Sequence, residues 1–270
     1  MASNPLALPW RIASHPVRDA LASPWVLAML CVLAVVGCWT ATGSTPAAFR
    51  NLWTWSPALL RGMWANIEIS ILAMALGTVA GLVIGALSLS THRWIRHLAR
   101  LWVQAFRNAP ILVLVYFTTY VFPFELHIGQ WTVPFPDWIK VVLGLALPAS
   151  ANVAEIFRGA IQSIPSAQWE AAQSLAFRRS QIFRLIVLPQ CLRRMLPPWM
   201  NLYASITMST SLASLVGVHD VVDTAQVASN TVARTDFTVL VYFTLLALFF
   251  AYCYPIARAT RALERRHDRH

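Results

Sequence analysis

The chain has 270 residues, of which 57% are hydrophobic and only 12% are charged, and this balance is too apolar for a water-soluble globular protein. Its formal net charge of +10 does not indicate nucleic-acid binding, because the basic residues stand at the ends of apolar runs and form no continuous patch. The composition therefore predicts an all-α, polytopic membrane protein made of a single domain.

Six apolar stretches approach the length of about 20 residues that a helix needs to cross a bilayer. The first of them follows two arginines but is not followed by a small-residue cleavage site, so we interpret it as a retained helix and not as a signal peptide. The stretches lie at 25–42, 62–89, 101–123, 138–157, 197–217 and 238–257.

The basic residues predict the orientation of these helices. Of the 21 Lys and Arg residues, 17 fall in the segments 1–24, 90–108, 158–196 and 258–270. The other four, Arg50, Arg61, Lys140 and Arg234, fall on the opposite side. Because cytoplasmic loops carry the excess of basic residues, both termini are predicted to be cytoplasmic, with the basic tail near anionic lipid.

The stretch 62–89 carries two further signals. Small residues recur at every fourth position, at Ala73, Gly77, Gly81 and Gly85, and such a row lets another helix approach closely. We interpret this row as a packing seam. Glu68 lies near the outer end of the same helix, where a carboxylate either faces a solute passage or reaches the lipid headgroups.

The stretch 197–217 is the most polar of the six, with two adjoining faces of hydroxyl and amide side chains. This is more polarity than contacts between helices require. We therefore predict that this helix lines a central passage through Asn201, Ser205, Ser209, Thr210 and Ser211. The following segment, 217–236, reads as a solvated outer loop with a short amphipathic helix, since His219 and Asp220 have no third convergent ligand for a metal.

The longest polar interruption in the chain is residues 155–190. Glu155 and Arg158 are three residues apart and share a helical face, which predicts an ion pair. Pro165 and Ser166 then predict the start of a short helix that runs to Phe177, with the serine as its cap. Such a helix is too short and too polar to bury itself, so this loop is predicted to meet a partner protein.

Within this loop, Glu170-Ala171-Ala172, three residues, Ala176, nine residues and Ile186-x-Leu188-Pro189 resemble the coupling loop of ABC importer permeases, which usually have glycine at the place of Ala176. The segments 155–165, 193–201 and 210–218 resemble the permeases for polar amino acids of the histidine, glutamine and glutamate type. The resemblance covers residues 58–266. It departs from the family at Asn108-Ala109, where Gly-Thr is frequent, and at Met208-Ser209, where Lys-Asp is frequent, which leaves the substrate contacts of this helix open.

Residues 1–57 are expected to hold a cytoplasmic tail, the extra transmembrane helix at 25–42 and an outer loop, and residues 259–270 a basic tail. The resemblance implies a five-helix permease core at 58–258 with a coupling loop at 158–196. It implies two permease subunits, identical or different, two cytoplasmic ATPase subunits and a periplasmic amino acid-binding protein, assembled in a bacterial inner membrane. The residues it places against the ATPase are Gln168, Glu170, Ala171, Ala172, Ala176 and Arg178.

The chain has no phosphate-binding G-x-x-x-x-G-K-[ST] loop, so ATP and Mg²⁺ are expected on the partner ATPase, and this chain is expected to bind no cofactor and to be no enzyme. An ion-coupled secondary transporter is the alternative, although it would need more acidic groups in the membrane than Glu68 and Glu155. The sequence thus predicts the permease subunit of an ATP-driven importer of polar or charged amino acids and leaves the amino acid itself open.

Overall fold

The computed structural model describes residues 45–128 and 131–267. The predicted first helix at 25–42 lies outside these residues. Helices make up most of the described chain, as the apolar composition predicts.

The elements follow one another along the chain as a series of helices with one hairpin. The series begins with α3 (Thr45–Ser88), α4 (Arg93–Asn108), α5 (Ile111–Val121), β1 (Glu125–Ile128), β2 (Trp131–Pro134), α6 (Asp137–Gln162), α7 (Ser166–Ser174) and α8 (Arg179–Ile182). It continues with the π-helical turn η1 (Phe183–Val187), α9 (Leu188–Ser209), the 3₁₀ helix η2 (Thr210–Val216), α10 (Val221–Val232) and α11 (Thr235–His267).

Three described helices, α3, α6 and α11, are long and apolar enough to cross a bilayer. The bent pair of α4 and α5 adds a fourth candidate span if the two helices cross the bilayer together. Together these helices correspond to four of the six predicted stretches. The predicted stretch 197–217 corresponds to the second half of α9 and to η2, and α9 is not among the helices that are long and apolar enough to cross a bilayer.

The predicted stretch 101–123 is not one continuous helix: the break or helix start that Pro110 indicates is present, and α4 and α5 meet at an angle of 104°. Pro110 causes the break, since it has no N–H to donate and restricts Ala109 before it to an extended conformation. The start of the fifth predicted helix is also corrected. α9 begins at Leu188 and contains Pro197 and Pro198, because buried side chains on both sides of the proline pair hold the helix in place.

The loop after α5 forms a β-hairpin that the sequence did not predict, with Leu126 opposite Val133 in the antiparallel register. Lys140, which the charge pattern placed with the outer loop residues, is fully buried near its base. Its ammonium donates to Asp137 Oδ1 (3.0 Å) and to the carbonyl oxygen of Thr119 (3.4 Å) and lies 3.7 Å from the Phe124 ring centre. This lysine therefore ties the end of α5 to the start of α6.

The row of small residues on α3 faces α6. Ala73 is fully buried, and a Cβ added at Gly77 would stand 2.5 Å from the Cβ of Ala149. At Gly81 and Gly85 the nearest α6 atoms would lie at 2.6 Å and 2.8 Å. The two helices therefore pack with almost no space between their backbones, which only residues without a bulky side chain allow.

Gly81→Ala should lower the stability of the protein in detergent by about 1–3 kcal/mol, because the new methyl group overlaps the Ser150 carbonyl oxygen on α6. The matched control is Gly159→Ala on α6, where a Cβ meets nothing within 4 Å and alanine favours the helix. Thermal unfolding would measure both. Equal melting temperatures for Gly81→Ala and the wild type would contradict a tight seam.

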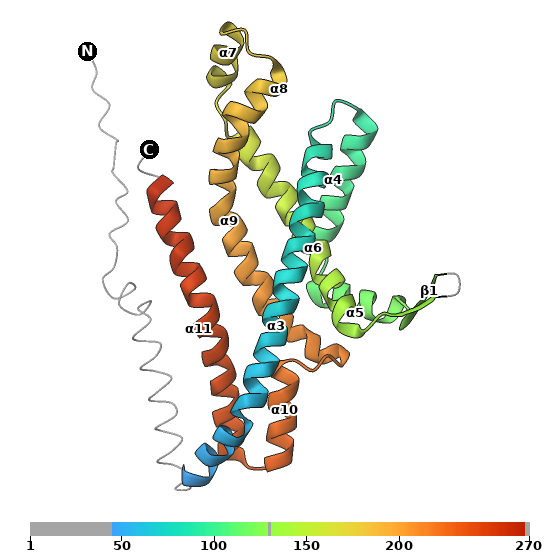
Figure 1. The fold of residues 1–270 in the computed structure, drawn as a ribbon, viewed down its shortest axis with the longest axis vertical. Coiled ribbons are helices and arrows are strands. Elements are labelled where there is room, and N and C mark those ends of the chain that lie inside the picture. The colour runs from blue at the N-terminus through green and yellow to red at the C-terminus, as the bar shows by residue number, and fades with distance from the viewer. Residues whose placement is uncertain (1–44, 129–130, 268–270) are drawn as a thin grey trace, which may run out of the picture.

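The fold has two distinct ends, visible in Figure 1. α7 and α8 lie at one end, together with the connection between α3 and α4. α10 lies at the opposite end beside the start of α3. We call these the α7 end and the α10 end.

Candidate functional site

α7 is the short helix that the loop pattern predicts, with small corrections at its ends. It begins at Ser166 with Pro165 in the cap position and no side-chain capping bond, so the predicted serine cap is wrong. It ends at Ser174, three residues before the predicted end, because the chain turns at Leu175 and Ala176.

One face of α7 is fixed to the rest of the protein. Ala172 is only 3% exposed and belongs to a buried apolar cluster with Ile164, Ile182 and Val187. Next to it, the Gln190 amide on α9 donates to Gln168 Oε1 at 2.7 Å. Ala172 and Gln168 therefore hold α7 on α9, so an enlarged side chain at 172 would displace α7 itself before it disturbed a partner.

The other face of α7 points away from the protein. Glu170, Ala171 and Arg178 are exposed, and Leu175 is 73% exposed. Among the residues that the structure describes, no ion pair or hydrogen bond reaches the Glu170 carboxylate. This face thus presents an unpaired charge beside an apolar side chain, a combination typical of a surface that meets another protein.

Ala176 occupies the left-handed region of the Ramachandran plot, with φ of 56°. This is the position where the resemblance to coupling loops leads us to expect glycine, and an L-residue with a Cβ is strained in this conformation. The chain makes this turn with alanine and stores the strain in the loop that follows α7.

Ala176→Gly should stabilise the loop by up to about 1 kcal/mol, because glycine adopts this conformation without the Cβ clash. Ala171→Gly serves as the control with the opposite sign, since 171 lies inside α7, where glycine costs about 1 kcal/mol. Hydrogen exchange of the peptide 166–182 would report both changes. Faster exchange in Ala176→Gly would contradict a strained alanine.

The polar residues of α9 and η2 divide into an exposed set and a buried one. Asn201 and Ser205 are exposed, and Ser209 and Ser211 are half-buried beside them, with their hydroxyls donating to the α9 carbonyl oxygens of Ser205 and Met208. Thr210 has no exposed surface and lies inside the protein. Four of the five residues predicted to line a passage thus stay candidates, and Thr210 has a structural position instead.

Thr210 belongs to a buried polar cluster at the α10 end that the sequence did not predict. The Asn66 amide of α3 donates to Thr210 Oγ1 (2.9 Å) and to Asp220 Oδ2 (3.0 Å). Asn66 Oδ1 in turn accepts from the Val221 N–H at 3.0 Å. We call these four residues the Asn66 clasp, because they join α3, η2 and α10.

Asp220 is the charged member of the clasp and also caps α10, since its Oδ1 accepts from the Asp223 N–H at 2.8 Å. Burial raises the pKa of the Asp220 carboxyl, and the hydrogen bonds from Asp223 and Asn66 oppose that rise. Gly62 lies against the same turn, where an added Cβ would be 2.7 Å from the Val221 Cα. Asp220 therefore has a structural role, contrary to the expected solvated loop.

The neighbouring His219 is exposed and pairs with Asp223 at 2.8 Å. Within 45–128 and 131–267 no group of three His, Cys, Asp or Glu residues is placed to hold a metal ion. The amphipathic helix expected in this segment is α10.

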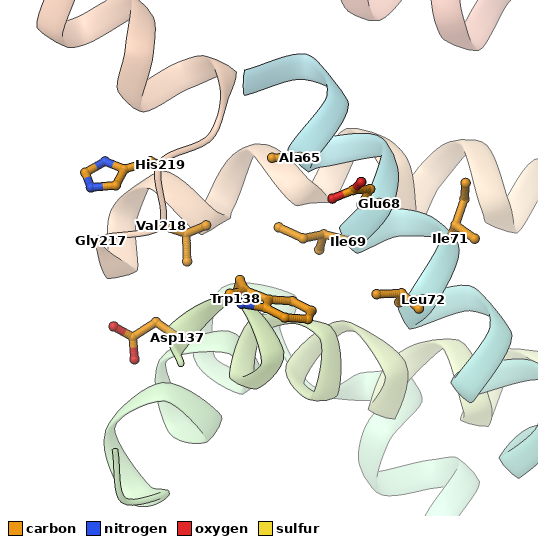
Figure 2. Close-up of a pocket in the computed structure, with 10 residues that line it drawn as sticks. All are labelled: Ala65, Glu68, Ile69, Ile71, Leu72, Asp137, Trp138, Gly217, Val218 and His219. Carbon is orange, nitrogen blue, oxygen red and sulfur yellow. The ribbon is translucent and has the colours of Figure 1, made fainter. Parts of the chain in front are cut away.

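Glu68 lies on a cavity of about 700 Å³ at the α10 end, between α3, the start of α6 and the turn at 217–219 (Figure 2). Figure 2 shows Trp138 between Leu72 and Asp137 on the far side of the cavity from His219. The Trp64 indole N–H donates to the Glu68 carboxylate. Glu68, Asp137 and His219 thus line one cavity from three separate segments, which the sequence alone did not indicate.

The predicted ion pair at the end of α6 is present. The guanidinium of Arg158 donates to both carboxylate oxygens of Glu155. Arg107 of α4 lies 3.9 Å from the same carboxylate, so the pair extends to a second helix.

Comparison with known proteins places this architecture. Residues 77–269 match the family described as binding-protein-dependent transport system inner membrane component. The octopine transport system permease protein of Rhizobium radiobacter is 32% identical over 216 residues, 79% of this chain and 87% of that protein. A probable amino-acid ABC transporter permease protein of Bacillus subtilis (strain 168) is 32% identical over 212 residues, 78% of this chain and 89% of that protein.

The fold agrees with solved structures. One described as the crystal structure of an amino acid ABC transporter with histidines covers 81% of this chain and 98% of its own chain, with a TM-score of 0.70 and 24% identity. Because the family match covers well over half of the chain and the octopine permease protein is similar along most of its length, this chain belongs to the inner membrane components of binding-protein-dependent transport systems, the permease subunits of ABC transporters.

Proposed function

We propose that this chain is the permease subunit of an ATP-driven, binding-protein-dependent importer of polar or charged amino acids. The observation that carries the proposal is the exposed face of α7, with its unpaired Glu170, in a chain of this permease family. The names of the two relatives, an octopine permease and an amino-acid permease, support the substrate class.

The proposal places the α7 end and both termini in the cytoplasm, because 17 of the 21 basic residues fall in segments on that side. The ATPase subunits, which carry ATP and Mg²⁺, dock on α7. The binding protein docks at the α10 end, and a second permease subunit faces the exposed polar residues of α9. In this arrangement the transport core is residues 58–258. Residues 1–57 form an N-terminal extension and residues 259–270 a tail.

The packing of α7 supports a mechanical role for this helix. Ala172 and Gln168 join α7 to the segment that leads into α9 without an intervening loop, through α8 and η1. Movement of α7 by the ATPase would therefore displace α9 as a body, together with Asn201, Ser205 and Ser209. Through this coupling, closure of the ATPase subunits on ATP would move the face of α9 that we propose lines the passage.

The charges around the cavity at the α10 end support a preference of the importer for one class of amino acids. Asp137 is neutralised by Lys140, whereas within 45–128 and 131–267 the Glu68 carboxylate has only the neutral indole of Trp64 as a donor. A net negative charge remains at the mouth of the passage and favours amino acids with a positively charged side chain.

Reconstitution tests the function. Liposomes that contain the permease, its ATPase and its binding protein should take up basic amino acids when ATP is present on the ATPase side. This uptake should stop without ATP or without the binding protein. Uptake that needs an ion gradient and no ATPase would support a secondary transporter and contradict the proposal.

Cysteine labelling tests the passage. Single cysteines at Ser205 and Ser209 should react with a water-soluble maleimide in the assembled complex, and transported substrate should slow the reaction because it occupies the passage. A cysteine at Leu246, exposed on the apolar helix α11, is the control expected to stay protected by lipid. Lipid-like protection at 205 and 209 as well would contradict a role in the passage.

A further inference from the structure

A second cavity, of about 310 Å³, lies at the α7 end between the end of α3, α4 and the last turns of α6. Its floor consists of the buried residues Ser88, Val103 and Ala154. Exposed or half-buried polar side chains form its rim, namely Arg100, Gln104, Glu155 and Arg158. A volume of this size suits a small solute and is far from the Glu68 cavity in the fold.

The rim has more positive than negative charge. Glu155 is the single carboxylate, and it is shared between Arg158 and Arg107. Arg100 contributes a third guanidinium, for which the described part of the chain supplies no ion-pair partner. Among the lining residues, Arg100 and Arg158 carry two positive charges against the one carboxylate of Glu155, and Arg107 lies outside the lining beside Glu155, so an anionic group is attracted to the opening.

The presence of both positive and negative groups at the rim discriminates between ligands that carry an anionic group. A phosphate dianion would meet Glu155 as a repelling neighbour. A zwitterion has one partner for each sign of charge, with a carboxylate for the arginines and an ammonium for Glu155. The small apolar patch of Val103 and Ala154 leaves space for a short side chain.

We propose that this cavity binds an α-amino acid, with its carboxylate on Arg100 and Arg158 and its ammonium on Glu155. This inference rests on the proposed function for its location, because in an importer the α7 end is the side of release. Amino acid that accumulates on that side fills the cavity and slows further transport. The site is thus distinct from the passage residues of α9 and from the Glu68 cavity.

The experiment uses the purified permease–ATPase complex without binding protein and measures equilibrium binding of radiolabelled L-glutamine. Arg100→Ala should weaken binding about tenfold, because it removes a charge-assisted contact from an exposed residue that the fold does not need. Arg93→Ala is the control, since Arg93 lies on the same helix over the Trp94 ring and does not line the cavity. Unlabelled L-alanine should compete with the label, and inorganic phosphate should not.

Uptake into liposomes keeps the two proposals apart. With ATP and L-glutamine enclosed on the ATPase side, uptake of a basic amino acid by the wild type should slow, whereas Arg100→Ala should take it up at the rate seen without enclosed glutamine. Equal binding by the two arginine variants, or competition by phosphate as strong as by alanine, would overturn the inference even if uptake is normal. Absence of any uptake, with binding that still depends on Arg100, would overturn the importer proposal and support the site.

Discussion

Glu170→Arg is expected to release the ATPase subunits from the permease while leaving the membrane fold intact. The carboxylate is exposed on α7 and has no partner in the described chain, so its reversal costs the fold little. A charged group opposite it in an interface would meet repulsion instead of attraction, at a cost of about 2–5 kcal/mol. Affinity should therefore fall by about 30-fold or more.

Co-purification of the ATPase with tagged permease would measure this loss, and ATP-driven uptake would fall in parallel. Glu125→Arg provides the matched control, because it makes the same charge change on the exposed strand β1, at a distance from α7. Retention of the ATPase by Glu170→Arg at wild-type levels would exclude the outer face of α7 as the docking surface. The thermal unfolding of both variants should match the wild type.

Asn66→Ala should detach α10 from the transport core, because it removes two donated hydrogen bonds and one acceptor from buried partners. Leaving Asp220 Oδ2 and the Val221 N–H without their partner costs about 3 kcal/mol. Hydrogen exchange in the peptide 218–232 should then accelerate by about 100-fold, since each 1.4 kcal/mol is a factor of ten. Asn108→Ala is the control, because the exposed Asn108 amide bonds only to a carbonyl of its own helix.

The effect of Asn66→Ala should depend on pH in one direction. The Asn66 donor lowers the pKa of Asp220, so its removal raises that folded-state pKa further above the unfolded value. The destabilisation is complete above the pKa of the variant and shrinks as the pH falls below it, because a protonated Asp220 has less need of the donor. The exchange ratio of variant to wild type should therefore be larger at neutral than at mildly acidic pH. A ratio that does not change with pH would show that the Asp220 charge is not what Asn66 stabilises.

The clasp also shows where interpretation of the sequence failed. His219 and Asp220 are adjacent in the chain and both read as solvated loop residues, yet one is exposed and the other is fully buried. No local pattern separates them, because the difference comes from Asn66, which is 154 residues away from Asp220. The charge pattern likewise did not show that Lys140 is buried, because the Thr119 carbonyl and the Phe124 ring come to it from before the hairpin, although its carboxylate partner Asp137 is three residues away.

The loop that contains α7 was predicted from the sequence only in part. Its helix and its likeness to a coupling loop follow from local residues, because proline, small residues and charge spacing act over a few positions. The local residues do not indicate which members of that motif face a partner. In the structure Ala172 is buried, while Ala171 next to it is exposed. A helix of nine residues has no periodicity long enough to identify its buried face from the sequence alone.

The sequence by itself determined the helical membrane class, the small-residue seam of α3 and the family, because hydropathy, spacing and motif are properties of contiguous residues. The tertiary structure alone decided the burial of Asp220 and Lys140 and the two cavities at opposite ends. The physical reason is that each cavity, and the burial of each of these two charges, depends on segments that lie apart in the chain. Their free energy comes from desolvation and pairing that exist only once those segments have packed.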